Sequence, residues 1–268
     1  MKLKVVLNKD IAFSNYLRTV INLERRPWLK GGPLKKIPLK LSRKAKEFGW
    51  PLEFSFEKHP TKDLNEYIKE FKRIIKQAEK FHNQDWQKHQ KELKKTAGIL
   101  REIACKHGDF IIKTISQITR NKWQYSDIWL VPSIYYGGTI VDNKIFAGYE
   151  ERTKENFYTL VIHELFHANE PSREKMRVFM NKLKLPTDSK EIATVLLTNK
   201  AIDRLNKKFN LNIRNQRFHT YYRESIAKLE PELKQLSGRI KSFSSMVISV
   251  DKFLTKKKYR GYYSQYNR

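Results

Sequence analysis

One short stretch constrains this chain more than any other: residues 160–168 have the sequence LVIHELFHA. Residues four apart lie on the same face of a helix, so His163 and His167 would point two imidazoles at one metal ion. Glu164 places a carboxylate beside them. The neighbours are uncharged and mostly apolar, as in a helix packed into a core, and Pro171 follows soon after. The pattern predicts a buried helix over residues 155–169; two ordinary surface histidines on an amphipathic helix are the alternative.

Two histidines and a third protein ligand, with one water, make a catalytic zinc site. A third histidine six residues after His167 is excluded, because Arg173 stands there. Glu191 is the best acidic candidate, since it begins a mostly apolar segment with helical spacing. Glu224 is the second candidate. The alternative for Glu191 is a capping box with Asp188, three residues earlier.

The residues before this helix predict strands. Residues 128–131 are apolar, and residues 134–141 and 144–149 flank the turn-prone pair Asp142 and Asn143. The first arm of that hairpin contains Gly137 and Gly138, which permit close approach of another backbone; a plain structural hairpin is the alternative. The N-terminal residues 1–8 also have the pattern of a strand. The predicted fold class is α+β, with a small mixed sheet before the motif helix and many helices around it.

With these features the chain resembles the gluzincins, the thermolysin-like group of zinc metallopeptidases, and is nearest in scale to the compact minigluzincins. The resemblance covers about residues 129–206, and Asn169 stands where the group usually has an apolar residue. It implies a zincin-like fold and one Zn²⁺ ion. It also implies a peptide or protein substrate held along an edge strand, which would be the first arm of the hairpin. The implied metal ligands are His163, His167 and Glu191.

The chemistry that the resemblance implies is peptide hydrolysis. Zinc lowers the pKa of a bound water to near 7 and polarises the substrate carbonyl. Glu164 would act as the general base and pass the proton to the leaving nitrogen. Gluzincins also use a downstream tyrosine or histidine to stabilise the oxyanion, for which His219, Tyr221 and Tyr222 are candidates. Packing of an aromatic-rich helix start on the core is the alternative for these three.

The second prominent feature is a formal net charge of +27. No acid interrupts the chain between Glu24 and Glu47, and residues 256–268 form a basic tail with interleaved tyrosines. Such charge attracts nucleic acid or anionic membrane, although many lysines would simply be solvated on outer helix faces. The alternative function is therefore a basic nucleic-acid-binding or interaction protein with a structural or degenerate metal site.

The remaining chain is mostly helical. Apolar spacing predicts helices over residues 64–81 and 85–106, a stop at His107 and Gly108, and a third helix capped by Asp109. Residues 229–254 predict one or two further helices. His59, His82, His89 and His107 are interpreted as surface or capping residues, and Cys105 as a core thiol.

The predicted organisation has four parts: an N-terminal strand and basic loop over residues 1–60, a helical region over 61–125, a zincin-like catalytic core over 126–210, and C-terminal helices with the basic tail over 211–268. One cysteine excludes an internal disulfide. No signal peptide or membrane-length apolar run is present in the sequence, so a cytoplasmic location is the simplest expectation. The oligomeric state stays open.

Overall fold

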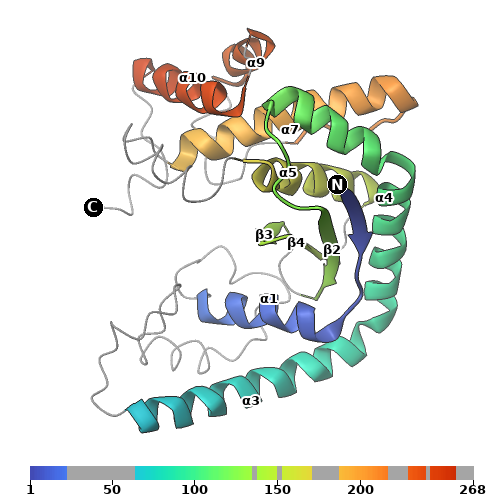
Figure 1. Cartoon of the computed structure of the whole chain (residues 1–268), viewed down its shortest axis with the longest axis vertical. Helices are drawn as coiled ribbons and strands as arrows, with labels where there is room; N and C mark the ends of the chain where they lie inside the picture. Colours follow the sequence, from blue (N-terminus) through green and yellow to red (C-terminus); the bar gives the residue numbers. More distant parts are fainter. Residues whose placement is uncertain are drawn as a thin grey trace.

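The computed structural model describes residues 1–22, 64–134, 138–149, 153–170, 187–216, 229–239 and 242–257. Within these residues the chain is α+β, with seven helices and a small mixed sheet of four strands (Figure 1). The elements in order are β1 (Lys2–Val5), α1 (Lys9–Asn22), α3 (Leu64–Lys88), α4 (Gln90–Thr119), β2 (Asp127–Ser133), β3 (Thr139–Val141), β4 (Lys144–Gly148), α5 (Lys154–Ala168), α7 (Thr187–Phe209), α9 (Glu230–Arg239) and α10 (Phe243–Lys256). The predicted basic loop, the basic tail and most of the stretch between α5 and α7 lie outside the described residues.

The sheet has the strand order β1-β2-β4-β3. Strand β1 is parallel to β2, β2 is parallel to β4, and β3 is antiparallel to β4. The predicted hairpin is confirmed: β3 and β4 are joined through Asp142, whose φ is 53°, and Asn143. Strands β1 and β3 are the two edges of this sheet, so the first arm of the hairpin lies at an edge, as the resemblance implied. The Gly138 amide extends the pairing of β3 by donating to the Phe146 carbonyl at 2.9 Å.

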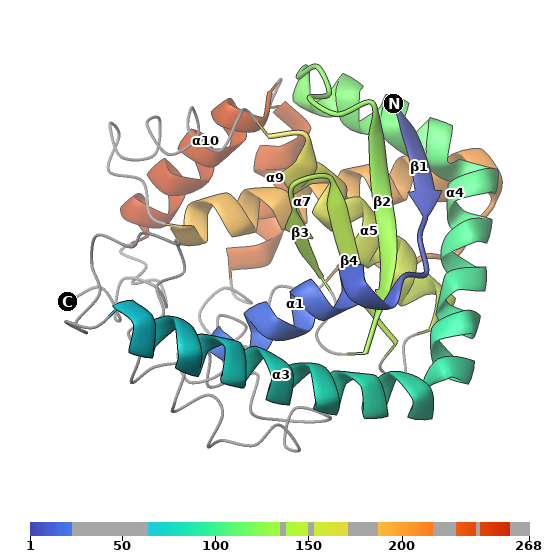
Figure 2. The ribbon, with the colours of Figure 1, turned by 60° about the horizontal axis from the view of Figure 1, so that its bottom comes forward.

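Both faces of the sheet are covered by helices, because its central strands are apolar on both sides (Figure 2). Ile128 and Leu130 of β2 belong to the larger core cluster, with α4, α5, α7 and α10. Val131 belongs to a smaller cluster with α1 and α3. Side chains alternate between the two faces of a strand, so one strand contributes to both cores. The helix α5, which carries the motif, lies in the larger core.

Helices α3 and α4 form a curved arc around the sheet (Figure 1). Their backbone hydrogen bonds continue across the junction, from the His89 amide to Asp85 and from the Leu93 amide to His89. The predicted helix stop at His107 and Gly108 is wrong, since α4 runs on to Thr119. Gly108 is buried within α4 and faces β1: a Cβ there would lie 3.5 Å from Leu3 Cδ1, an ordinary van der Waals contact.

Two side-chain interpretations are also corrected. Cys105 is exposed and not a core thiol, because its helical phase places it on the outer side of α4. His82 is buried, 1% exposed, among Phe13, Tyr16 and Trp86, and is not a surface residue. Within the described residues, the helices are too short or too polar to span a bilayer.

Candidate metal centre

Helix α5 carries the motif and is buried on nearly every face. The Thr153 hydroxyl caps its N-terminus by accepting from the Asn156 amide at 3.3 Å. At its C-terminus the buried Asn169 contacts Thr119 with its side chain, and its carbonyl accepts from the Asn121 amide group at 2.9 Å. Asn169 thus connects the end of α5 to the end of α4 and to the residues that follow it. These contacts place a polar side chain at a buried position where gluzincins usually have an apolar residue. The predicted motif helix is confirmed.

Helix α7 brings Glu191 to the motif. The helix begins at Thr187, so Asp188 lies inside it and the capping-box alternative does not describe this helix start. Residues 192–199 are all buried, which packs α7 against α5 through the large core. Glu191 faces the two histidines, with its side chain 20% exposed. The three residues that the sequence nominated as metal ligands are therefore brought together.

The three candidate ligand atoms form a compact triangle. The Nε2 atoms of His163 and His167 are 3.1 Å apart, and Glu191 Oε2 lies 3.8 Å from the first and 3.5 Å from the second. A point about 2.0 Å from all three atoms follows from these separations, and zinc takes nitrogen and oxygen ligands at about 2.0–2.2 Å. The residues present therefore fit an ion of that size without moving.

The outer nitrogen of His167 is held by a carboxylate. Its Nδ1 lies 2.6 Å from Glu170 Oε1, and Glu170 Oε2 lies 2.8 Å from Lys190 Nζ. Glu170 is 8% exposed, so this contact is made away from bulk water. A histidine ligand usually donates its second ring N–H to such a carboxylate, which sets the tautomer and the ring orientation. In the neutral form of His167, the contact with Glu170 would place the ring proton on Nδ1 and the lone pair on Nε2.

The outer nitrogen of His163 is held by an amide. Its Nδ1 lies 2.9 Å from Gln216 Oε1. The backbone of Gln216 is itself fixed by Asn199 on α7: the Gln216 amide donates to Asn199 Oδ1 at 2.6 Å, and Asn199 Nδ2 donates to the Gln216 carbonyl at 3.0 Å. The residues after α7 thus return to the site and orient the first histidine.

Glu164 lies beside this triangle and is 5% exposed. Burial raises the pKa of its carboxyl to about 7; the nearby His167 opposes the shift, while Glu191 and Glu170 add to it. A Cβ on Gly138 would lie 3.5 Å from Glu164 Oε1, so the start of the edge strand passes close to this carboxyl group. Gly138 has a φ of 87°, a conformation that other residues rarely adopt.

The other ionisable groups at the site, Glu191, His167 and Lys190, shift one another's pKa values. Burial alone would raise the pKa of Glu191, but the charge and hydrogen bond of His167 hold that pKa well below its usual value. Burial would lower the pKa of His167, yet Glu191 and Glu170 raise it well above its usual value. The pKa of Lys190 is raised by Glu170 against the effect of burial. In the absence of an ion, a positive charge near the triangle is therefore strongly favoured.

Several residues bear on the sequence predictions. Glu224, His219, Tyr221 and Tyr222 lie outside the described residues, so the second ligand candidate and the oxyanion candidates stay predictions. Sequence reasoning missed Glu170, Lys190 and Gln216. The first two stand next to Asn169 and Glu191. Glu170 also follows His167 by three residues, the spacing at which a carboxylate can reach the outer nitrogen of a histidine on the same helix. Gln216 had no such signal.

No known protein family, curated protein or solved structure matches the chain. The resemblance to gluzincins therefore rests on the motif residues and on their spacing.

Proposed function

We propose that the chain is a zinc-dependent peptidase of gluzincin type. His163, His167 and Glu191 would hold one zinc ion, and Glu164 would act as the general base. The observation that carries the proposal is the convergence of three acceptor atoms on one point about 2.0 Å from each, the distance at which zinc binds such ligands. A zincin-like fold is part of the same proposal.

The hydrogen-bonding pattern supports a cation at this point. Both Nδ1 atoms face acceptor oxygens, from Gln216 and Glu170, so each neutral imidazole carries its proton there. Both Nε2 lone pairs then face each other at 3.1 Å, next to the Glu191 carboxylate. Three converging acceptors repel unless a positive group lies between them. A proton relieves one contact, whereas a divalent ion satisfies all three.

A bound zinc ion would supply a water of lowered pKa and a Lewis acid for the substrate carbonyl. Glu164 is placed to take the proton of the attacking water and deliver it to the leaving nitrogen, and a raised pKa suits both steps. Among the described residues, strand β3 lies at one edge of the sheet, where an extended peptide would add as a further strand. Its start at Gly138 lies beside Glu164, which would bring the peptide to the base.

The ligand count supports a catalytic rather than a structural centre. A structural zinc site usually has four protein ligands, whereas a catalytic one keeps a position open for water. Within the described part of the chain, His163, His167 and Glu191 are the histidine and acidic side chains that lie close enough together to share one ion. Glu164 is adjacent and outside this set, as a base must be.

Metal content and peptide cleavage test the proposal on the full-length chain. The wild type should retain about one zinc per chain after dialysis and cleave peptides from a mixed library. Glu164→Gln should keep the zinc and lose cleavage, whereas His167→Ala should lose both. Glu155→Gln serves as the control, because Glu155 is an exposed acid on the same helix. Stoichiometric zinc in His167→Ala, or full cleavage by Glu164→Gln, would overturn the assignment of that residue.

A further inference from the structure

The outer side of the α3–α4 arc carries a row of cations. Its positions are three or four residues apart, so they follow one face of the two helices. The charged members are Arg73, Lys76, Lys80, Lys91, Lys94 and Arg101, and each is exposed. The positions between them on the same face are Gln84, Gln87 and Gly98, so no acid interrupts the row. At 1.5 Å per residue the row extends over about 42 Å.

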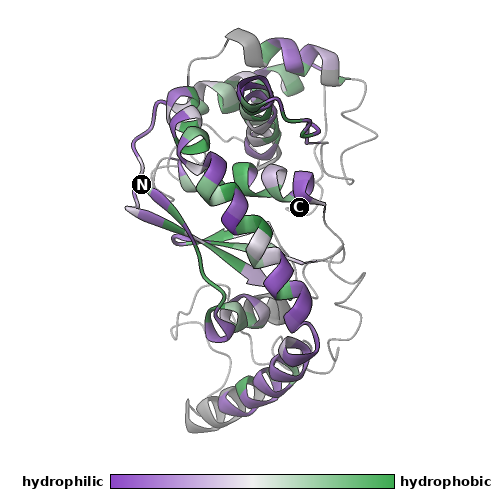
Figure 3. Ribbon diagram, turned by 90° about the vertical axis from the view of Figure 1, so that its right-hand side faces the viewer, coloured by the Kyte–Doolittle hydropathy of each residue, from purple (hydrophilic) through white to green (hydrophobic). Residues whose placement is uncertain are grey.

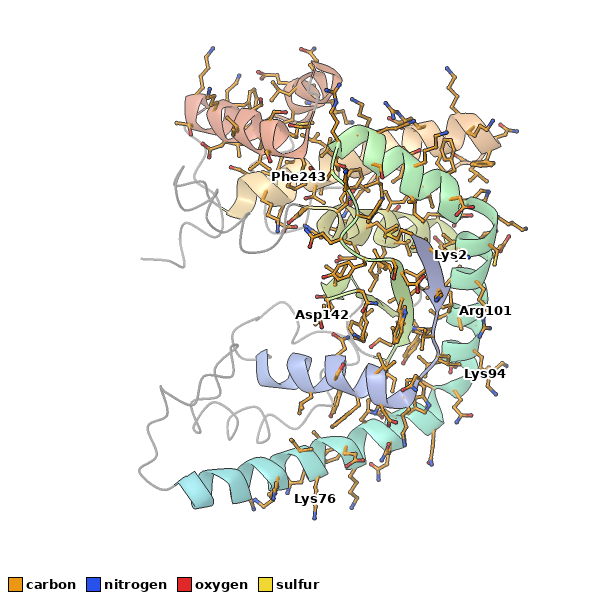
Figure 4. The ribbon with its side chains drawn as sticks, viewed as in Figure 1. Lys2, Lys76, Lys94, Arg101, Asp142 and Phe243 are labelled. Atoms are coloured by element: carbon orange, nitrogen blue, oxygen red, sulfur yellow. The ribbon has the colours of Figure 1, made fainter. Side chains whose placement is uncertain are left out.

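This face is opposite the buried side of the arc. Ala78, Leu93, Ala97 and Leu100 are buried toward the sheet and α1. Figure 4 shows Lys76, Lys94 and Arg101 on the outer side, pointing away from the rest of the molecule. Hydrophilic residues predominate along α3 and the outer side of α4 (Figure 3). The row is therefore presented on a rigid convex surface and not on a loop.

The arc is more one-sided in charge than the rest of the described surface. Residues 72–106 have ten exposed cations and two exposed acids, Glu79 and Glu92, which lie at the margins of the row's face. The other described residues have fourteen exposed cations and six exposed acids. Like charges three or four residues apart destabilise a helix. A bound polyanion would reverse that penalty, whereas solvent alone would not.

We propose that this row, Arg73 to Arg101 on the outer face of α3 and α4, binds the phosphate backbone of duplex nucleic acid without reading its sequence. About 42 Å corresponds to about twelve phosphates along one strand of a duplex. Single-stranded binding would call for exposed aromatic side chains on which bases stack. Among the described residues, Phe81 is the one large hydrophobic side chain that is exposed, with 37% of its surface accessible. The cations are therefore not accompanied by a row of aromatic rings for stacking or by an apolar face that could insert into a membrane. The inference stands independently of the proposed peptidase activity.

A charge-matched pair of variants of the full-length chain tests this proposal. The first replaces Lys76, Lys80, Lys91 and Lys94 with glutamine, which preserves helix propensity. The control replaces Lys207, Lys208, Lys252 and Lys256, exposed lysines of α7 and α10, and removes the same net charge. Binding to a 30-base-pair mixed-sequence DNA duplex is measured by fluorescence anisotropy at a series of salt concentrations, with circular dichroism to verify folding.

The expected result is salt-dependent duplex binding by the wild type and at least a tenfold loss of affinity at 100 mM salt in the arc variant. Four lost phosphate contacts would reduce the slope of log K against log salt by up to about 3.6. Because the arc is convex, a reduction of about 2 or more is expected. The control variant should lose less than threefold. Equal losses in both variants would assign the binding to net charge and overturn the proposal, as would binding only to single strands or to phosphatidylserine vesicles.

Discussion

Replacing Glu170 with glutamine tests the most informative contact of the candidate metal centre. The substitution keeps the shape of the side chain but removes the negative charge that lies 2.6 Å from His167 Nδ1 and 2.8 Å from Lys190 Nζ. Loss of such a carboxylate partner weakens metal binding by about 10- to 100-fold. The zinc dissociation constant of Glu170→Gln should therefore rise by this factor, while the three ligands stay in place.

The same change can be expressed as a difference in stability. A ligand at 100 times its dissociation constant stabilises the folded state by about 2.7 kcal/mol. At that free zinc concentration, a 10- to 100-fold weaker site would contribute only about 1.4 to 0.4 kcal/mol. The metal-free variant should itself be less stable by about 1–3 kcal/mol, because the half-buried Lys190 ammonium loses its carboxylate partner.

Zinc affinity is measured by competition with a fluorescent chelator, and stability by urea unfolding with zinc and with excess chelator. Glu155→Gln is the matched control, since it removes the same charge from an exposed site on α5. It should change zinc affinity by less than twofold. Unchanged zinc affinity in Glu170→Gln would refute the assigned role of Glu170 in orienting His167, and an equal loss in the control would show that only net charge matters.

Three further predictions concern groups around this centre. Burial lowers the pKa of His82 from 6.5 to about 4, so between these pH values the unfolded chain binds a proton that the folded chain does not. The free energy of unfolding should therefore be constant above about pH 7 and fall by about 2–3 kcal/mol on acidification to pH 4.5. Urea unfolding of His82→Phe should not show this fall. Gly138→Ala should destabilise the chain by about 1–3 kcal/mol because of its φ of 87°, and should reduce any cleavage more than it reduces stability, since the added methyl lies against Glu164. Asn199→Ala should release the backbone of Gln216, which would appear as faster hydrogen exchange of residues 211–216 and several-fold weaker zinc binding.

The elements that the sequence predicted are those whose signal is local. Helix α5 follows from its apolar flanks, the hairpin from Asp142 and Asn143, and β1 from the first residues of the chain. Glu191 could be nominated because a carboxylate in an apolar helix start has few other roles. Its approach to the histidines depends on how α7 packs on α5, and that packing is not encoded by any one segment.

The errors and omissions arise from tertiary packing. Gly108 has the local signature of a helix stop, yet it is buried beside Leu3 of β1 and the helix continues. His82 lies in a segment with many polar and charged residues, but the aromatic rings that surround it come partly from α1, more than sixty residues earlier. Gln216 follows the end of α7, and its backbone bonds to Asn199 bring it to His163. Each depends on contacts between distant segments, which periodicity does not report.

The charge around the candidate metal centre relates Glu170 and Lys190 to the proposed function. Three carboxyl groups, from Glu164, Glu170 and Glu191, lie in a region that is mostly buried, and Lys190 compensates one of them. A bound ion would require neutral histidines; with all three carboxyl groups ionised, the surrounding side chains would then carry a formal charge of −2, which a divalent ion would balance. Buried charges are costly unless they are paired. Acceptors at both Nδ1 atoms would set the tautomers with Nε2 lone pairs that a shared ion requires, which agrees with the proposed zinc site.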